Sequence, residues 1–171
     1  MDNWSLKFET KYDFSTLKKF NRYNLYSKAT TWIITVIALL LIVIGLISGS
    51  FDTTYRLLFC CVGALWILEV IFLPNIYAKS TIKTSKLNNV AIVEVTLDSN
   101  NISMITRKGD SVVSNGTIDY DDVYKICDTK EFIYIYISKN QAVICSKENM
   151  EGNYEEGKKF ISEKIGKKYK A

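Results

Sequence analysis

The side chains that could do chemistry in this 171-residue sequence are few, and they lack the partners that catalysis needs. There is no histidine, which removes the commonest general base, the commonest metal ligand and the usual pH switch. Serines and lysines are plentiful, but no nucleophile elbow, phosphate-binding loop, zinc-protease motif or EF-hand pattern accompanies them. We therefore expect a protein that is not an enzyme and that needs no cofactor.

An acidic run is the nearest approach to a metal site. Asp119, Asp121 and Asp122 could together hold a divalent cation, but no glycine-bearing loop or further ligand series follows them. If the run is a strand, alternation puts Asp119 and Asp121 on one face and Asp122 on the other. We interpret it as a solvent-exposed strand entry and expect no metal.

The cysteines have neither the CxxC pattern nor the spacing of a zinc site. We expect them to be small buried apolar side chains. They are Cys60, Cys61, Cys127 and Cys145.

Glu69 is the one unusual residue, because it lies inside the apolar run 57–78. A charge in mid-membrane costs about 2.5–3.5 kcal/mol on insertion scales. A carboxylate there could relay protons or bind a cation, which makes Glu69 a candidate functional residue. Alternatively it lies near the interface, is protonated, or bonds to Thr31 or Thr35 of the preceding apolar run. An oligomer would favour the functional interpretation.

Two apolar runs are long enough to be transmembrane helices, at residues 29–51 and 57–78. A bilayer needs about 20 apolar residues in a helix. The first run has no charged residue before Asp52 and lacks the position and cleavage site of a signal peptide. Pro74 is expected to kink the end of the second. The short segment 48–56, SGSFDTTYR, fits only an antiparallel hairpin.

Basic residues fix the expected orientation of this hairpin. The loop has only Arg56, whereas several basic residues flank the two runs, so both termini are expected to be cytoplasmic, in a multi-pass protein of the cell membrane. The same residues could face anionic lipid or act only as topology signals. They are Lys18, Lys19, Arg22 and Lys28 before the hairpin, and Lys79, Lys83 and Lys86 after it.

The N-terminal segment 1–28 predicts a strand and then a helix. In the strand, Trp4, Leu6 and Phe8 alternate with polar residues, which is typical of a half-buried strand. Asp13 or Ser15 is expected to cap the helix that follows.

The segment 79–171 predicts a cytoplasmic β-rich domain. Short strands separated by turn signals indicate an antiparallel meander. A helix over residues 154–169 is expected to close it, with an apolar stripe against the sheet formed by Phe160, Ile161 and Ile165.

The strand at residues 132–137 is apolar on both faces, which predicts a central strand. A two-residue turn at Lys139-Asn140 would pair Ile135 with Ile144 and Tyr134 with Cys145. The isoleucine face would then be core. The aromatic face would line a ligand groove, or the N-terminal strand or C-terminal helix would cover it.

Three stretches of this domain resemble the YcxB-like protein family. They are IDYDDVYKI at 118–126, EFIYIYI at 131–137, and QAVI at 141–144 with Lys147. Val123 stands at the family's aliphatic position, and Cys145-Ser146-Lys147 replaces the usual I/V-P-K. The resemblance implies a bacterial membrane protein with a small β domain, comparable to a pleckstrin-homology fold. It implies no established activity and hence no catalytic residues.

The sequence as a whole predicts an α+β membrane protein: a two-helix transmembrane hairpin plus a small antiparallel β-sheet domain closed by a C-terminal helix. We expect a non-enzymatic binding or regulatory module, anchored in the bilayer, with a protein partner or, less favoured, a lipid headgroup; a homo-oligomer stays open. The charge balance, 22 Lys and Arg against 18 Asp and Glu, argues against nucleic acid. The alternative is an immunity or stress-defence protein that acts through the hairpin.

Overall fold

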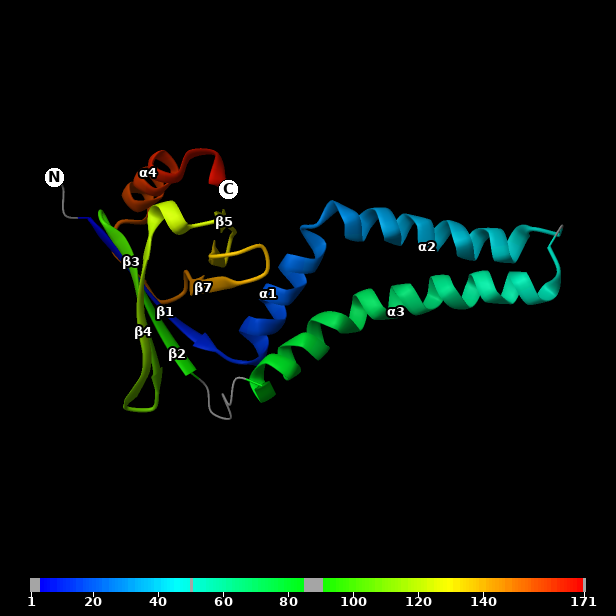
Figure 1. Cartoon of the computed structure of the whole chain (residues 1–171), viewed down its shortest axis with the longest axis horizontal. Coiled ribbons are helices and arrows are strands. Elements are labelled where there is room, and N and C mark those ends of the chain that lie inside the picture. Colours follow the sequence, from blue (N-terminus) through cyan, green and yellow to red (C-terminus); the bar gives the residue numbers. More distant parts are fainter. Residues whose placement is uncertain (1–3, 50, 85–90, 171) are drawn as a thin grey trace. The chain divides into compact units, whose positions relative to one another are not determined.

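The computed structural model describes residues 4–49, 51–84 and 91–170. They form two compact units (Figure 1). The β unit combines the N-terminal strand, up to Asp13, with the residues from 91 onwards. The helical unit holds the described residues between 14 and 84. The N-terminal strand and the helix that follows it therefore belong to different units.

The larger sheet of the β unit has five strands, and every neighbouring pair is antiparallel. The N-terminal strand β1 lies between β2 and β8, so it pairs with one strand from the middle of the chain and with one from its C-terminal part. In spatial order the strands are β4 (Ser111–Asp119), β3 (Asn101–Lys108), β2 (Ala91–Asp98), β1 (Ser5–Tyr12) and β8 (Met150–Glu151).

The second sheet has four strands, in the order β7 (Ala142–Ser146), β6 (Phe132–Tyr136), β5 (Lys125–Asp128) and β9 (Tyr169–Lys170). The pairing of β5 with β9 is parallel, which the predicted meander did not include. The helix α4 (Tyr154–Ile165) precedes a short 3-10 turn, η2 (Gly166–Lys168), which leads into β9. The predicted helix over 154–169 is therefore too long, and it ends where Gly166 adopts a φ of 54°.

One hydrophobic core is shared by both sheets and by α4. Leu6 and Phe8 of β1 are buried in it, which confirms the predicted alternation of the N-terminal strand. From α4, Ile161 and Ile165 enter the core and Phe160 packs against it, as the apolar stripe predicted. Gly157 lies where α4 approaches Leu6, because an added Cβ would collide with that side chain.

Side chains of β1 hold the edge of the second sheet. The backbone N–H of Ile144 donates to the Tyr12 hydroxyl, and that of Ser146 donates to the Thr10 hydroxyl, each at 2.8 Å. Since β7 is an edge strand, these amides would otherwise lack a ladder partner. The hydroxyls of Thr10 and Tyr12 on β1 therefore serve as hydrogen-bond acceptors where β7 has no neighbouring strand.

The predicted register of β6 with β7 is wrong by one residue. Tyr134 lies opposite Ile144, and Ile135 lies opposite Val143. The connection is wider than a two-residue turn, because the N–H groups of Ile137 and Ser138 both donate to the carbonyl of Gln141. The isoleucine face nevertheless enters the core, as predicted, with Ile133 and Ile135 both buried.

The aromatic face of β6 is also buried rather than open, at Phe132, Tyr134 and Tyr136. The N-terminal strand and α4 contribute to the core on the isoleucine side. The acidic run, interpreted in the sequence as a strand entry, instead forms a 3-10 turn, η1, at Tyr120–Asp122, and the strand β5 begins only at Lys125. Strand alternation therefore does not describe the acidic run.

The helical unit consists of α1 (Phe14–Tyr26), α2 (Ala29–Ile47) and α3 (Thr53–Thr84). Helices α2 and α3 lie side by side as an antiparallel hairpin (Figure 1). The connection is shorter than predicted: α2 ends before residue 51, and residues 53–56 already belong to α3, which runs on through Pro74 and past Ala78. Both helices are long and apolar enough to cross a membrane.

Small residues allow the two long helices to pack closely. A Cβ added at Gly63 would lie 2.6 Å from the carbonyl oxygen of Ala38, and one added at Gly45 would lie 2.7 Å from that of Arg56. Close approach at small residues is a common way of packing helices in membranes, where no hydrophobic force holds them together.

Candidate functional site

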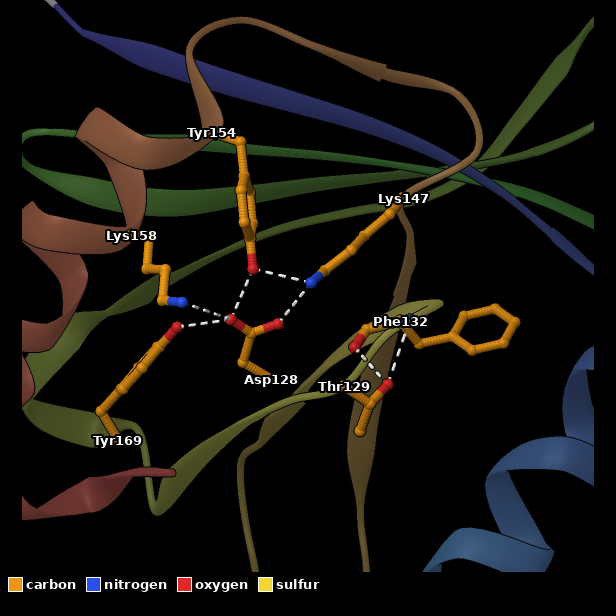
Figure 2. A network of polar contacts seen from close by, with 7 residues as sticks. All are labelled: Asp128, Thr129, Phe132, Lys147, Tyr154, Lys158 and Tyr169. Atoms are coloured by element: carbon orange, nitrogen blue, oxygen red, sulfur yellow. Dashed lines mark hydrogen bonds and ion pairs between the residues drawn. The ribbon is translucent and has the colours of Figure 1, made fainter. Parts of the chain in front are cut away.

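A buried carboxylate of the β unit has four polar partners among the described residues. The side chain of Asp128, at the end of β5, is 5% exposed. It pairs with Lys147 at 2.6 Å, accepts hydrogen bonds from the hydroxyls of Tyr154 and Tyr169, and has the Lys158 ammonium at 4.0 Å (Figure 2). Beside it, the Thr129 hydroxyl bonds the backbone of Phe132 and closes the β5–β6 turn.

The electrostatics of this cluster favour an ionised Asp128. Burial alone would raise the pKa of that carboxyl, but the hydrogen bonds from Lys147, Tyr154 and Tyr169 outweigh it and lower the pKa below its ordinary value. Burial first, and then the bond to Asp128, raises the pKa of both tyrosines. The hydroxyls are therefore neutral donors at neutral pH.

This Asp128 cluster works as a clamp between elements. Its members come from β5, from the end of β7, from α4 and from β9, so it ties the C-terminal segment to the four-stranded sheet. The donors of the chain itself already occupy the carboxylate, so the arrangement is suited to holding structure rather than to turnover. Sequence reasoning missed it, and the one available signal was a carboxylate directly after the apolar Ile126 and Cys127.

A groove lies on the outer face of the five-stranded sheet. Its volume is about 590 Å³, and it runs across β8, β1, β2 and β3. Its charged lining residues on β1 and β2 alternate with the core residues Leu6, Phe8, Val93 and Val95, so these charged side chains point away from the core. The lining residues that matter here are Lys7, Glu9, Glu94, Ile105 and Glu151.

The groove is acidic, because three glutamates line it against one lysine. Glu9 and Glu94 face each other directly in the β1–β2 register, a like-charge pair that destabilises a sheet. Arg107 offsets Glu94 with an ion pair of 2.7 Å. Within the described parts of the chain, Glu9 has no such counter-ion, and Lys7 lies opposite Glu151.

A smaller cavity of about 310 Å³ continues from the groove towards the free edge of the sheet. It lies between β3 and β4 and shares Ile105 with the groove. An apolar side chain therefore lies between two hollows on one face.

Glu69 lies in the middle of α3 and is exposed. The proposed bonds to Thr31 and Thr35 do not form. The Thr31 hydroxyl donates to the carbonyl of Leu25 at 2.9 Å. The Thr35 hydroxyl donates to the carbonyl of Thr31 at 2.7 Å and accepts from Trp66 Nε1 at 3.2 Å.

Arg56 has a role that sequence reasoning missed. Its guanidinium donates to the carbonyls of Gly45 and Leu46, each at 3.0 Å. These carbonyls belong to the last turn of α2, where a positive charge offsets the negative end of the helix dipole. The only basic residue between the two apolar runs is thus engaged within the hairpin.

The predicted lipid-facing residues are all exposed. Three lie on α1, one directly precedes α2, and two lie in the last turns of α3; Lys86 falls outside the described residues. Their contact with lipid stays a prediction. In chain order they are Lys18, Lys19, Arg22, Lys28, Lys79 and Lys83.

Residues 104–161 match the model of the YcxB-like protein family. The matched segment runs from within β3 into α4 and includes Asp128, Lys147 and Tyr154 of the clamp. This match confirms the resemblance seen in the sequence. No curated protein and no solved structure matches the chain.

Proposed function

We propose that this YcxB-like protein is a membrane-anchored, non-enzymatic binding module whose sheet groove holds a segment of a protein partner. The groove carries the proposal, because it combines concavity, exposed charges and an apolar floor on one rigid sheet. The clamp at Asp128 supports it indirectly by fixing the opposite sheet and α4, so that the grooved face is preorganised.

The anchor is the hairpin of α2 and α3. In the most apolar window of each helix only 17% of the residues are buried, so most apolar side chains point outwards. Leaving such a surface in water would cost about 25 cal/mol per Å². A bilayer removes this cost, and the basic residues that flank the hairpin favour a cytoplasmic location for both chain ends, in the cell membrane.

The acidic lining indicates which partner class fits. A protein segment that carries Lys or Arg would offset Glu9 and Glu151, whereas an anionic lipid headgroup would be repelled. Two sheets closed by a C-terminal helix are also consistent with the kinship to pleckstrin-homology folds that the resemblance implied. Tethering raises the local concentration of a weak binder, so a small interface is sufficient.

The test is photocrosslinking in intact membranes. A photoreactive amino acid at Thr96, in the groove, is compared with one at Ser114, which is exposed on β4 outside the lining. We expect a discrete protein adduct from position 96 only, and its loss in Glu9→Lys. No adduct at 96, or the same adduct from both positions, would overturn the groove as the binding site.

A second function is favoured by Glu69, whose exposed carboxylate lies on an apolar helix. In this alternative the hairpin acts inside the membrane, as an immunity or stress-defence protein would. The substitutions Glu69→Gln and Glu9→Lys distinguish the hairpin function from the groove function in any assay whose signal requires this protein. Loss with Glu69→Gln alone supports the hairpin, and loss with Glu9→Lys alone supports the groove.

A further inference from the structure

Glu69 stands in the centre of an exposed apolar face of α3. The residues that surround it are three, four, seven and eleven positions away, so they lie on the same side of the helix. All of them are large, apolar and between 48% and 65% exposed. This Glu69 face consists of Leu58, Val62, Leu65, Phe72 and Ile76 around the carboxylate.

The depth of Glu69 follows from helix geometry and rests on the proposed membrane anchor. At 1.5 Å per residue, Glu69 lies roughly 18 Å from Leu57 and roughly 14 Å from Ala78, the ends of the apolar run. The hydrocarbon core is about 30 Å thick, so the carboxylate lies near its middle. A side chain as short as Glu cannot reach either interface from there.

Two other polar groups of the hairpin are already engaged. Thr35 holds Trp66, and Arg56 donates to the end of α2, thirteen positions before Glu69 along the chain. Residues 29–49 contain no charged side chain. Among the residues that the structure describes, Glu69 has no hydrogen-bond or ion-pair partner.

We propose that the Glu69 face binds a transmembrane helix of another protein, one that carries Lys or Arg near mid-membrane. Charge complementarity selects this occupant, because an ion pair in a medium of low dielectric relieves both unpaired charges. A second copy of this chain does not supply the cation that Glu69 needs, since its own hairpin would bring a second carboxylate and no cation at that depth.

The test uses the full-length protein in phosphatidylcholine vesicles, with a donor fluorophore, and synthetic Leu-rich transmembrane helices with an acceptor. The helices differ only in one central residue: Lys, Leu or Glu. We expect energy transfer to the Lys helix at an affinity about tenfold above that for the Leu helix. Glu69→Gln should abolish this preference, and Glu69→Lys should transfer it to the Glu helix.

A matched variant tests the face rather than the charge. In Glu69→Leu with Leu68→Glu, the carboxylate keeps its depth but turns by roughly 100° around α3. The preference for the Lys helix should then be lost.

Three results would overturn the proposal: equal binding of the Lys and Leu helices, a preference that survives Glu69→Gln, or energy transfer between copies of the chain that depends on Glu69. Protease protection of the hairpin in the same vesicles identifies which idea failed. An unprotected hairpin rejects the membrane anchor together with this proposal. A protected hairpin without a preference rejects only the helix partner.

Discussion

Lys147 and Asp128 form an ion pair of 2.6 Å between the ends of β7 and β5, and the aspartate side chain is 5% exposed while the lysine side chain is 20% exposed. Breaking one partner of such a pair leaves the other charge partly desolvated. Removing either partner is therefore expected to cost more stability than removing one partner of a surface ion pair.

Replacing Asp128 by Asn should destabilise the β unit by about 3 kcal/mol, the low end of the range for breaking a buried pair, because Lys147 keeps some contact with water. Urea unfolding of the detergent-solubilised protein measures this. Lys158→Gln is the matched control, since that ammonium lies at 4.0 Å and is more exposed, and it should change stability little. Equal effects of the two substitutions would contradict the clamp.

The same carboxylate predicts a dependence on pH. The pKa of Asp128 is lowered in the folded protein, so its contribution is present above the ordinary value of about 3.8 and is lost as the pH falls through the folded value below it. The unfolding midpoint should decline over this acidic window. In Asp128→Asn that part of the decline should be missing, and an unchanged profile would exclude Asp128 as its source.

Tyr12→Phe removes the hydroxyl that accepts the N–H of Ile144. A buried amide without a partner costs about 1–3 kcal/mol, so a loss of this size is expected in chemical unfolding. Hydrogen exchange at Ile144 should accelerate more than at Ile135, which is in the next strand and keeps its ladder. Tyr124→Phe, at an exposed tyrosine, should leave both unchanged.

Gly63→Ala should loosen the hairpin, because the new Cβ would lie 2.6 Å from the backbone oxygen of Ala38 and that backbone must move. Gly49→Ala is the control, since nothing lies within 4 Å of its added Cβ. Thermal unfolding in detergent should show a lower midpoint for the helices in Gly63→Ala alone. An unperturbed midpoint would mean that the helices do not pack as closely as described.

Features that depend on neighbouring residues in the chain could be predicted from the sequence, whereas features that depend on residues far apart could not. The alternation of Leu6 and Phe8, the two apolar faces of β6 and the stripe of α4 are local patterns, and the structure confirms them. The β6–β7 register failed because it depends on which backbone groups close the turn at Gln141, and a one-residue change there shifts every pair.

The parts that could not be predicted involve partners far apart in the chain. Asp128 meets Tyr154 and Tyr169, which lie 26 and 41 positions further along the chain. The parallel pairing of β9 with β5 brings Tyr169 there, and Tyr154 comes from the start of α4. Arg56 was counted as a topology charge, although its hydrogen bonds place it on the end of α2. Neither relationship has a periodic signal in the sequence.

The position of β1 has a consequence for how the protein is made. This strand leaves the ribosome before the other described elements, yet its neighbours β2 and β8 are translated only after both long helices. During synthesis its apolar side, with Leu6 and Phe8, has no sheet to join until residue 98 has emerged, and β8 arrives some fifty residues later. Folding of the sheet is therefore necessarily late, and the apolar side of β1 stays uncovered until α2, α3 and β2 have been synthesised.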